Sequence, residues 1–218
     1  MNVAELLEQV IRDRKTSKVL ADAPLGVATD RAAVEAIVAN AGWAPFHRPA
    51  ASVHAEGGGE QPVVPWRCFM LDVDACRSLR DWLLARGETG SMTRLLAACS
   101  AMVIVTWLPN PWSSPRPEGT DPAQLFEGTL DNMEHLAAAS AAVQNILLSA
   151  TARGYRSFWA TGGPIRTAES LARIGVPSSQ LALGCVFLFG PDSNGAPAKP
   201  GPMRERRGAP QDWSRWVK

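Results

Sequence analysis

The sequence predicts a single domain of the α/β or α+β class. Segments with the three-to-four-residue periodicity of helices alternate along the chain with short apolar runs that are typical of strands. The composition changes nowhere sharply enough to mark a domain boundary, and no internal repeat is evident. With 218 residues, of which 46% are hydrophobic and 20% charged, the chain can bury a sizeable core. The spacing of the strands leaves room for crossovers without fixing strand direction.

An amphipathic helix is expected at the N-terminus. Its apolar side chains recur every three or four residues, at Val3, Leu6, Leu7, Val10 and Ile11. Asn2, with Glu5 three residues later, is typical of a capping box. We expect this helix to end within residues 12–18 and a second helix to run from about Asp30 to Gly42.

The middle of the chain combines a long loop with strands and helices. From Pro45 to Pro65, three consecutive glycines and several prolines accompany two histidines, which predicts a functional or a disordered loop. After this loop we expect strands over residues 66–71 and 101–108, with helices over residues 75–86 and 92–98 between them.

A long helical region is expected in the second half of the chain. Residues 121–124 combine an N-cap aspartate, an N1 proline and an N3 glutamine, which predicts a helix start. The region extends, with a break near Gly128, to Gly154, and residues 137–143 are nearly all alanine. Small side chains on every face predict close packing on several sides, in a buried central helix or at the seam of a dimer.

The last third of the chain is expected to complete the sheet and then leave it. Strands are predicted over residues 156–160 and 181–189, with a helix over residues 165–174 between them. Beyond Gly190 the chain is rich in proline, glycine and arginine, which is typical of an irregular tail.

Overall charge, the N-terminus and the cysteines limit the classes of function. A net charge of +1 argues against nucleic acid or a membrane as a partner, so any anion site must be local. Residues 1–11 lack the features of a signal peptide, and no segment approaches the roughly 20 apolar residues of a membrane span. We therefore expect a cytoplasmic protein.

Reduced, structural thiols are expected at the four cysteines, which show no CxxC spacing: Cys68, Cys76, Cys99 and Cys185.

The sequence contains no self-sufficient catalytic constellation. It lacks a G-x-S-x-G elbow, a Walker loop, an HExxH motif and a G-x-G-x-x-G turn. His47 and His54 share a loop with Glu56 and Glu60, but a flexible loop fixes no metal geometry. His135 lies within a helical pattern, where a histidine with a structural role is more common than a general base. Redox or group-transfer chemistry would therefore need a bound organic cofactor.

The most informative segment is Arg14-Lys15-Thr16-Ser17-Lys18, at the expected end of the first helix. Arginine offers a bidentate fork to phosphate oxygens, lysine a point charge and threonine a directional hydroxyl. A helix C-terminus carries partial negative charge, so side chains would have to hold the anion. The alternative is that these cations only offset the helix dipole and cap its last carbonyls, and the segment taken alone favours that alternative.

Several segments, in order along the chain, match the motifs of one enzyme family. Arg-x-Thr-x-Lys at residues 14–18 matches an Arg-x-Ser-x-Arg/Lys signature after a first helix. Gly42-Trp43-Ala44-Pro45 matches an Ala-x-x-Ala-Pro element, and Pro65-Trp66-Arg67-Cys68-Phe69 matches a Gln-Pro-Trp-x-Phe strand. Residues 141–162 match a long central helix containing Gln-Asn-Leu-Leu-Leu-Ala-Ala and the strand that follows it. Together these segments resemble the nitroreductase family over nearly the whole chain.

This resemblance implies a fold and an assembly. It implies a central mixed sheet flanked by helices, a long central helix, and a homodimer that binds FMN at the subunit interface and has a C-terminal arm. Residues 1–218 would form one domain, with a loop insertion at about 46–64 and a C-terminal extension from about 191. The insertion replaces the family's short Ser-x-x-Asn-x-Gln link. It is interpreted either as a lid over the flavin that narrows the choice of acceptor or as a disordered excursion.

The resemblance also implies which residues bind the cofactor. The phosphate and ribityl chain would be contacted by Arg14, Lys15, Thr16 and Lys18. A second cationic arm would be supplied by Lys199, Arg204, Arg206 or Arg207. From the partner subunit the isoalloxazine would be approached by Pro45 and by Phe46, which replaces the family's usual serine. Near the flavin N5 edge would lie Thr161 and Gly162. No side chain is required as a catalytic acid or base, and no metal is implied.

The implied activity is that of an FMN-dependent oxidoreductase. Hydride would pass from NADH or NADPH through flavin N5 to a nitroaromatic, a quinone or a similar small electrophile. The same fold is used for reductive dehalogenation and for flavin fragmentation. Two alternatives stay open: a flavin-binding or interaction protein of the same fold with little turnover, and an α/β domain whose cationic ends bind some other phosphate.

Overall fold

The computed structural model describes residues 2–54, 63–113, 115, 126–193 and 195–217. Its centre is a four-stranded sheet in the order β2-β3-β5-β4, in which every neighbouring pair is antiparallel. The strands are β2 (Trp66–Asp72), β3 (Ala101–Trp107), β4 (Arg156–Ala160) and β5 (Leu181–Phe189). A parallel bridge between Thr16 and Ser157, at the β4 edge, gives the arrangement its mixed character. The expected α+β class is confirmed.

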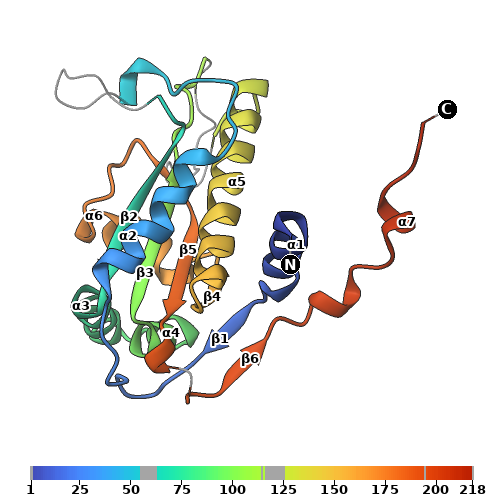
Figure 1. Cartoon of the computed structure of the whole chain (residues 1–218). Coiled ribbons are helices and arrows are strands. Elements are labelled where there is room, and N and C mark those ends of the chain that lie inside the picture. The colour runs from blue at the N-terminus through green and yellow to red at the C-terminus, as the bar shows by residue number, and fades with distance from the viewer. Residues whose placement is uncertain (1, 55–62, 114, 116–125, 194, 218) are drawn as a thin grey trace.

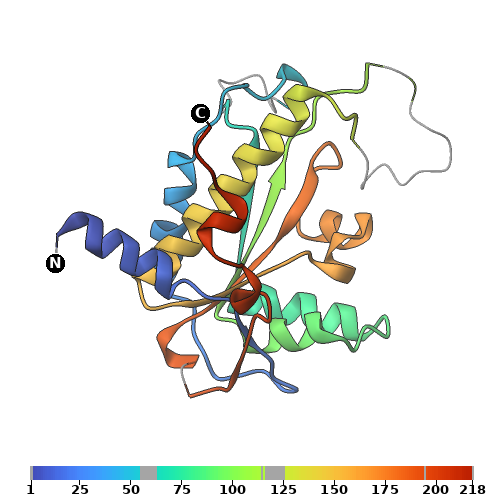
Figure 2. The same cartoon turned by 90° about the vertical axis from the view of Figure 1, so that its right-hand side faces the viewer.

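Helices cover both faces of the sheet, as Figures 1 and 2 show. On one face lie α2 (Arg31–Ala39), the 3-10 helix η1 (Asn40–Trp43) and the long α5 (Leu130–Ala152). On the other face lie α3 (Val73–Leu84), α4 (Ser91–Ala98) and α6 (Ala168–Arg173). Successive side chains of a strand point to opposite faces, so in β3 Val103 and Val105 pack toward α5, whereas Met102 and Ile104 pack toward α3 and α4.

The long central helix predicted from the sequence is α5. Thr129 caps its first turn, and Gly154, with φ of +75°, follows its end. Ala139 and Ala142 are fully buried against the sheet, where small side chains let helix and sheet approach closely. The predicted helix start at residues 121–124 lies outside the described residues.

The first helix, α1 (Val3–Asp13), has the predicted capping box. Oδ1 of Asn2 accepts a hydrogen bond from the N–H of Glu5 at 2.9 Å, and the N–H of Asn2 donates to the Glu5 carboxylate at 2.9 Å. None of the residues of α1 is buried, and Leu6 and Leu7 on its apolar face are 52% and 55% exposed. Helix α1 contacts α5, but the described chain leaves most of its apolar face uncovered.

A short strand that the sequence does not predict follows α1. This strand, β1 (Ser17–Val19), pairs antiparallel with β6 (Ala198–Pro200), so the two ends of the chain meet in a small second sheet. A three-residue strand has too few residues to show a periodicity, and its pairing depends on residues about 180 positions away.

The helix predicted over residues 165–174 forms as two pieces. They are the 3-10 helix η3 (Gly163–Arg166) and α6. The break occurs at Thr167, whose Oγ1 accepts a hydrogen bond from the N–H of Ser170 at 3.2 Å and so caps a new helix.

Beyond β6 the chain leaves the body of the molecule as an arm, visible in both views. The preceding turn, η4 (Pro191–Ser193), still packs on the body, and the arm carries η5 (Arg204–Arg206) and α7 (Pro210–Trp213). Trp213 is 68% exposed and Trp216 is 97% exposed. Among the described helices, none combines the length and the apolar character needed to cross a membrane.

Candidate functional site

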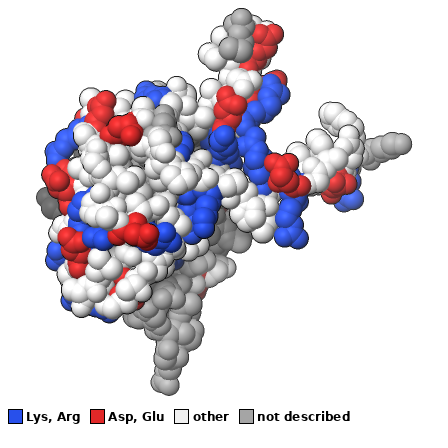
Figure 3. Space-filling model, turned by 90° about the horizontal axis from the view of Figure 1, so that it is seen from below, with Lys and Arg blue, Asp and Glu red and all other residues white. Residues whose placement is uncertain are grey.

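A cationic cavity lies where the arm leaves the body. Its volume is about 310 Å³, and its lining comes from both ends of the chain: Arg14, Lys15, Thr16, Pro200, Gly201, Pro202, Met203, Arg204 and Arg207. Figure 3 shows Lys and Arg side chains gathered between the body and the arm. Four of these nine lining residues are cationic and none is acidic. The cavity is therefore suited to an anion.

Local backbone structure places these groups. Helix α1 ends at Asp13, and Arg14 takes an extended conformation with ψ of 112°, which turns the chain into β1. The carbonyl of Thr16 accepts a hydrogen bond from the N–H of Gly201 at 3.2 Å. A Cβ atom on Gly201 would lie 2.8 Å from Cβ of Thr16, so only glycine allows the arm to pass this close.

The cations of the cavity divide into two roles. Arg204 donates hydrogen bonds to the carbonyls of Arg12 at 2.6 Å and Arg14 at 3.2 Å, and so caps the last turn of α1. Because Arg204 performs this capping, the side chains of Arg14 and Lys15 are not required for it. Burial lowers the pKa of Arg14, and the neighbouring charges of Arg207 and Arg204 lower it further. A bound anion would relieve this repulsion.

Two further predicted cations face each other beside the cavity. Lys18 of β1 is directly opposite Lys199 of β6, an arrangement that is destabilising for like charges in a sheet unless an anion lies between them. The ammonium of Lys18 lies 5.6 Å from the ring centroid of Phe158. Neither lysine lines the cavity, and neither does Arg206, which is exposed on the arm.

Thr161 and Gly162 follow the end of β4, the edge strand that is bridged to Thr16 of the cavity. The bridge from Thr16 joins β4 at Ser157, and Thr161 follows four residues later, roughly 13 Å along the strand at about 3.3 Å per residue. The backbone of Gly162 has φ of +110°. Arg166 donates a hydrogen bond from Nη1 to the carbonyl of Thr161 at 3.2 Å, which holds this turn. Strand β4 and the parallel β1 beside it therefore lead from the cationic cavity toward the predicted flavin-edge residues.

Replacement of Gly162 by alanine is expected to destabilise the protein by roughly 1–3 kcal/mol. The φ of Gly162 is unfavourable for residues with a Cβ atom, and the added Cβ would lie 2.8 Å from Cγ of Arg166. Urea unfolding followed by circular dichroism measures the change. Gly42→Ala is the matched control, because a methyl carbon added there would meet no atom within 4 Å, and a change within about 0.5 kcal/mol is expected. Equal effects at the two glycines would contradict this account.

Pro45 and Phe46 line a second cavity, of about 180 Å³, against α5. Phe46 meets Trp66 edge to face, with ring centroids 5.8 Å apart and an interplanar angle of 83°. The cavity shares no lining residue with the cationic one. Within one chain the structure thus does not bring Pro45 and Phe46 together with Arg14.

An apolar groove of about 510 Å³ separates α1 from α5 and η1. Val3, Leu6 and Leu7 line one side, and Trp43 and Leu148 line the other. Trp43 is 85% exposed. The sequence predicts either burial or a dimer seam at the alanines of α5, whereas the apolar surface left open by the fold belongs mainly to α1. The amphipathic pattern of α1 indicates this surface, but only the structure shows that the described chain does not cover it.

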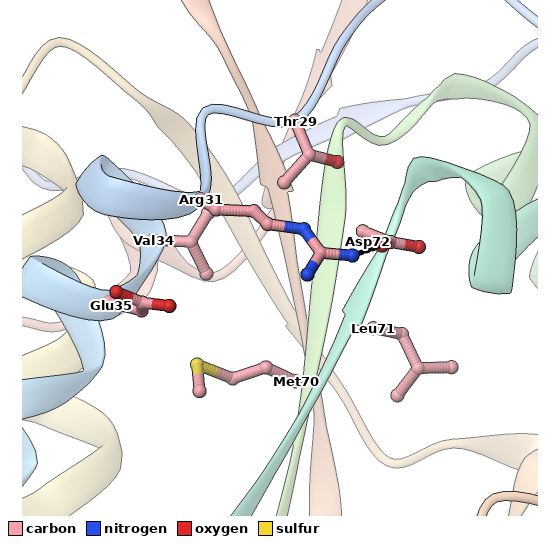
Figure 4. A pocket seen from close by; sticks show the side chains of 7 residues that line it. All are labelled: Thr29, Arg31, Val34, Glu35, Met70, Leu71 and Asp72. Atoms are coloured by element: carbon pink, nitrogen blue, oxygen red, sulfur yellow. Dashed lines mark hydrogen bonds and ion pairs between the residues drawn. The ribbon is translucent and has the colours of Figure 1, made fainter.

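A fourth cavity, of about 160 Å³, lies beside β2 and is drawn in Figure 4. Arg31 reaches across it and forms an ion pair with Asp72, the N-cap residue of α3. The N–H of Ala75 and the guanidinium of Arg31 hold the pKa of Asp72 below its usual value. Thr29 accepts a hydrogen bond from the N–H of Val73 at 2.7 Å. These polar groups interact with one another. We therefore interpret the cavity as part of the cap at the start of α3.

One hydrogen bond joins the two described sides of the inserted loop, and one contact joins the loop to the body. The N–H of Ala50 donates to the carbonyl of Val63 at 2.8 Å, and Nε2 of His54, in the 3-10 helix η2 (Ser52–His54), lies 2.8 Å from the carbonyl oxygen of Pro109. Residues 55–62, including Glu56 and Glu60, lie outside the described residues. The lid interpretation therefore stays a prediction.

The remaining candidate side chains have structural surroundings. Nδ1 of His135 lies 2.9 Å from the carbonyl oxygen of Leu108, as expected for a helix histidine with a structural role. All four cysteines are unpaired, as predicted, and burial raises the pKa of Cys68 and of Cys185 to about 12. In the described part of the chain, no group of three or more His, Cys, Asp or Glu side chains could hold a metal ion.

Comparison with known proteins identifies the fold. No protein-family model matches the chain, and no curated protein matches it. A nitroreductase-like family protein from Bacillus cereus is 21% identical, with 93% of this chain and 95% of that one covered and a TM-score of 0.59. A nitroreductase with bound FMN from Desulfitobacterium hafniense is 16% identical over 100% of both chains, with a TM-score of 0.54. The nitroreductase CinD from Lactococcus lactis, in complex with chloramphenicol, is 12% identical over 97% of this chain and 99% of its own, with a TM-score of 0.60. The chain therefore has the nitroreductase fold, as its sequence motifs predict.

Proposed function

We propose that this chain is a homodimeric, FMN-dependent oxidoreductase of the nitroreductase family that reduces a nitroaromatic, a quinone or a similar small electrophile with NADH or NADPH. The observation that carries the proposal is the cavity lined by Arg14, Lys15, Thr16, Arg204 and Arg207. It lies on a fold that is also found in a nitroreductase with bound FMN.

The composition of the cavity fits the phosphate of FMN. A phosphate monoester carries close to two negative charges at neutral pH and has three strong acceptor oxygens. Arg14 and Arg207 offer guanidinium forks to these oxygens, Lys15 a point charge and Thr16 a hydroxyl. Arg204 acts as a positioning residue, because its hydrogen bonds to the carbonyls of Arg12 and Arg14 fix the arm against α1.

Strand β1 runs parallel to β4 from the bridge at Thr16 and lies beside it, so the two strands lead from the cavity toward Thr161 and Gly162. We place the flavin ring there, where backbone groups beyond the end of β4 can hydrogen-bond a ligand. Lys18 and Lys199, which face each other beside the cavity, lie where they can contact the phosphate or the ribityl chain.

FMN, when bound, would supply two-electron transfer between the nicotinamide and the acceptor. The protein would contribute binding, orientation and electrostatics. Cations near the cofactor stabilise its reduced, negatively charged form, and backbone N–H groups at the end of β4 orient its ring. No buried acid or base of the described chain is needed for proton transfer, because the substrate side of such a site exchanges protons with water.

The uncovered surfaces of the chain support a homodimer. The apolar face of α1 and the exposed Trp43 would be buried by a second copy, and so would the aromatic residues of the arm. In such a dimer Pro45 and Phe46 would approach the flavin of the partner subunit, which agrees with their separation from the residues that line the cationic cavity. The cytoplasm, which supplies NADH and NADPH and keeps thiols reduced, suits this reaction and the four unpaired cysteines.

The proposal is tested by the colour of the purified protein and by its response to nicotinamides. We expect a yellow protein with an absorption band near about 450 nm that NADH or NADPH bleaches under anaerobic conditions. Titration with each nicotinamide separately identifies the preferred donor. Colour without bleaching would favour the alternative of a flavin-binding protein with little turnover. A colourless protein that takes up no added FMN would leave only the alternative of a different phosphate ligand.

A further inference from the structure

The cavity beside Phe46 has apolar walls and one acidic group. Pro45 and Phe46 form one side, and Ala137, Ala138 and Ala141 of α5 form the other. The polar lining residues are Glu134 and His47. The alanines of α5 leave space beside the phenyl ring of Phe46, and we call this space the slot.

The volume of the cavity limits what it can hold. An apolar cavity of about 150 Å³ is sufficient for one benzene ring. At about 180 Å³, this cavity matches a single substituted six-membered ring and is too small for a dinucleotide or for the flavin itself. Its volume and lining therefore favour a group with a single ring.

Glu134 is the only acidic residue among the described residues that line this cavity. Its Oε2 is shielded from solvent and has no hydrogen-bond partner among the described residues. The nearest cation is Arg48, whose Nε lies 3.5 Å away and is also 3.4 Å from Oδ1 of Asp131. This contact is an ion pair that is too long for a good hydrogen bond. Because Oε2 is shielded, only the rest of the Glu134 side chain, which is 31% exposed overall, can meet a ligand in the cavity. Its negative charge would favour a ligand that brings a positive charge or an N–H or O–H group.

We propose that this cavity binds the ring of the electron acceptor, and that Glu134 selects acceptors carrying a hydrogen-bond donor or a positive charge. The inference rests on the proposed function, in which Pro45 and Phe46 of one subunit lie against the flavin of the partner. An acceptor ring in the slot would then have the alanines of α5 behind it and the flavin beside it. Glu134 would hold the substituent at the far end of the ring from the group that is reduced.

The test compares acceptors that differ only in this substituent. The set is 4-nitrobenzylamine, 4-nitrobenzyl alcohol, 4-nitrotoluene and 4-nitrobenzoate. In each case the nitro group takes two electrons and two protons and becomes a nitroso group and water, while NADH becomes NAD⁺. The wild-type protein is expected to show kcat/KM falling in that order. Glu134→Gln keeps the shape but removes the charge, and we expect the amine-to-benzoate ratio to fall by about 10-fold or more.

Asp131→Asn is the matched control. It removes the same charge from the same helix and from the same partner, Arg48, but Asp131 does not line the cavity. Its amine-to-benzoate ratio is expected to stay within a factor of about two of the wild-type value. A Glu134→Gln ratio equal to that of wild type, or an equal fall in both variants, would overturn the inference.

A second variant and a binding measurement keep the test independent of turnover. Ala137→Leu fills the slot at an exposed helix position where leucine is well tolerated, and it is expected to raise KM for every ring in the set while FMN binding is unchanged. Calorimetry with benzylamine and FMN-loaded protein should show binding that Glu134→Gln weakens and Asp131→Asn does not. Unchanged KM in Ala137→Leu would contradict the location. Failure of the wild-type protein to bind FMN would refute the proposed function, a result distinct from any outcome among the variants.

Discussion

Replacing Arg14 by alanine is expected to weaken FMN binding by roughly 10- to 100-fold. A hydrogen bond to a charged group contributes about 1.5–3 kcal/mol, and each 1.4 kcal/mol is a factor of ten in affinity. Arg14 is half-buried in the cavity, where screening by water is weaker than at the surface, and its pKa is already lowered by burial and by two neighbouring arginines. Titration of FMN fluorescence against apoprotein measures the effect.

Two comparisons separate a specific phosphate contact from a general loss of positive charge. Arg206→Ala removes the same charge from the neighbouring arm but lies outside the cavity lining, so its FMN affinity should change by less than about threefold. Riboflavin lacks the phosphate, and Arg14→Ala should bind it as well as the wild-type protein does. Equal losses for FMN and riboflavin, or equal losses in the two variants, would remove Arg14 from the phosphate site. The same pair of ligands applied to Arg207→Ala tests the contribution of the arm.

The sequence predicts the core of this fold well, because the core elements are long and locally patterned. Strands β4 and β5 form over the predicted residues, 156–160 and 181–189, since each is a run of strand-forming side chains between glycine or proline turns. The capping box of α1 also forms as predicted, since Asn2 and Glu5 are three residues apart, and α2 begins close to the predicted start at Asp30. The pairing of β1 with β6 could not be predicted in this way, because each strand has three residues and its stability depends on the other.

The candidate site combines residues that a local sequence pattern identifies with residues that come from far along the chain. The cations at residues 14–18 are visible in the sequence, but as a charged helix end they have an ordinary explanation. The structure changes this interpretation by showing that Arg204, from the far end of the chain, caps the helix instead. The close approach of Gly201 to Thr16 positions the arm. In this position Arg204 and Arg207 line the cavity, whereas Arg206 does not. No local pattern in the sequence distinguishes these arginines.

The exposed face of α1 leads to the second large expected effect, on assembly. Leu7→Glu should raise the dissociation constant of the homodimer by about 10³-fold or more. Burial of one leucine side chain contributes about 1.5–3 kcal/mol, and two-fold symmetry places the substitution in the interface twice. Together the two sites cost about 4 kcal/mol, even before the penalty for burying a carboxylate is added. Sedimentation velocity over a range of protein concentrations measures the change.

Ala4→Glu is the control, because it introduces the same side chain on the same helix at a position that does not line the groove between α1 and α5. A glutamate in the first turn of α1 is also favourable to the helix dipole, so this variant should stay dimeric and folded. If the flavin ring is enclosed by Pro45 and Phe46 of the partner, Leu7→Glu should lose FMN as it dissociates, and raising the protein concentration should restore both dimer and colour. A monomeric Leu7→Glu protein that retains FMN with wild-type affinity would show that the site is complete within one chain. A dimer as stable as that of the wild type would show that the groove is not the interface.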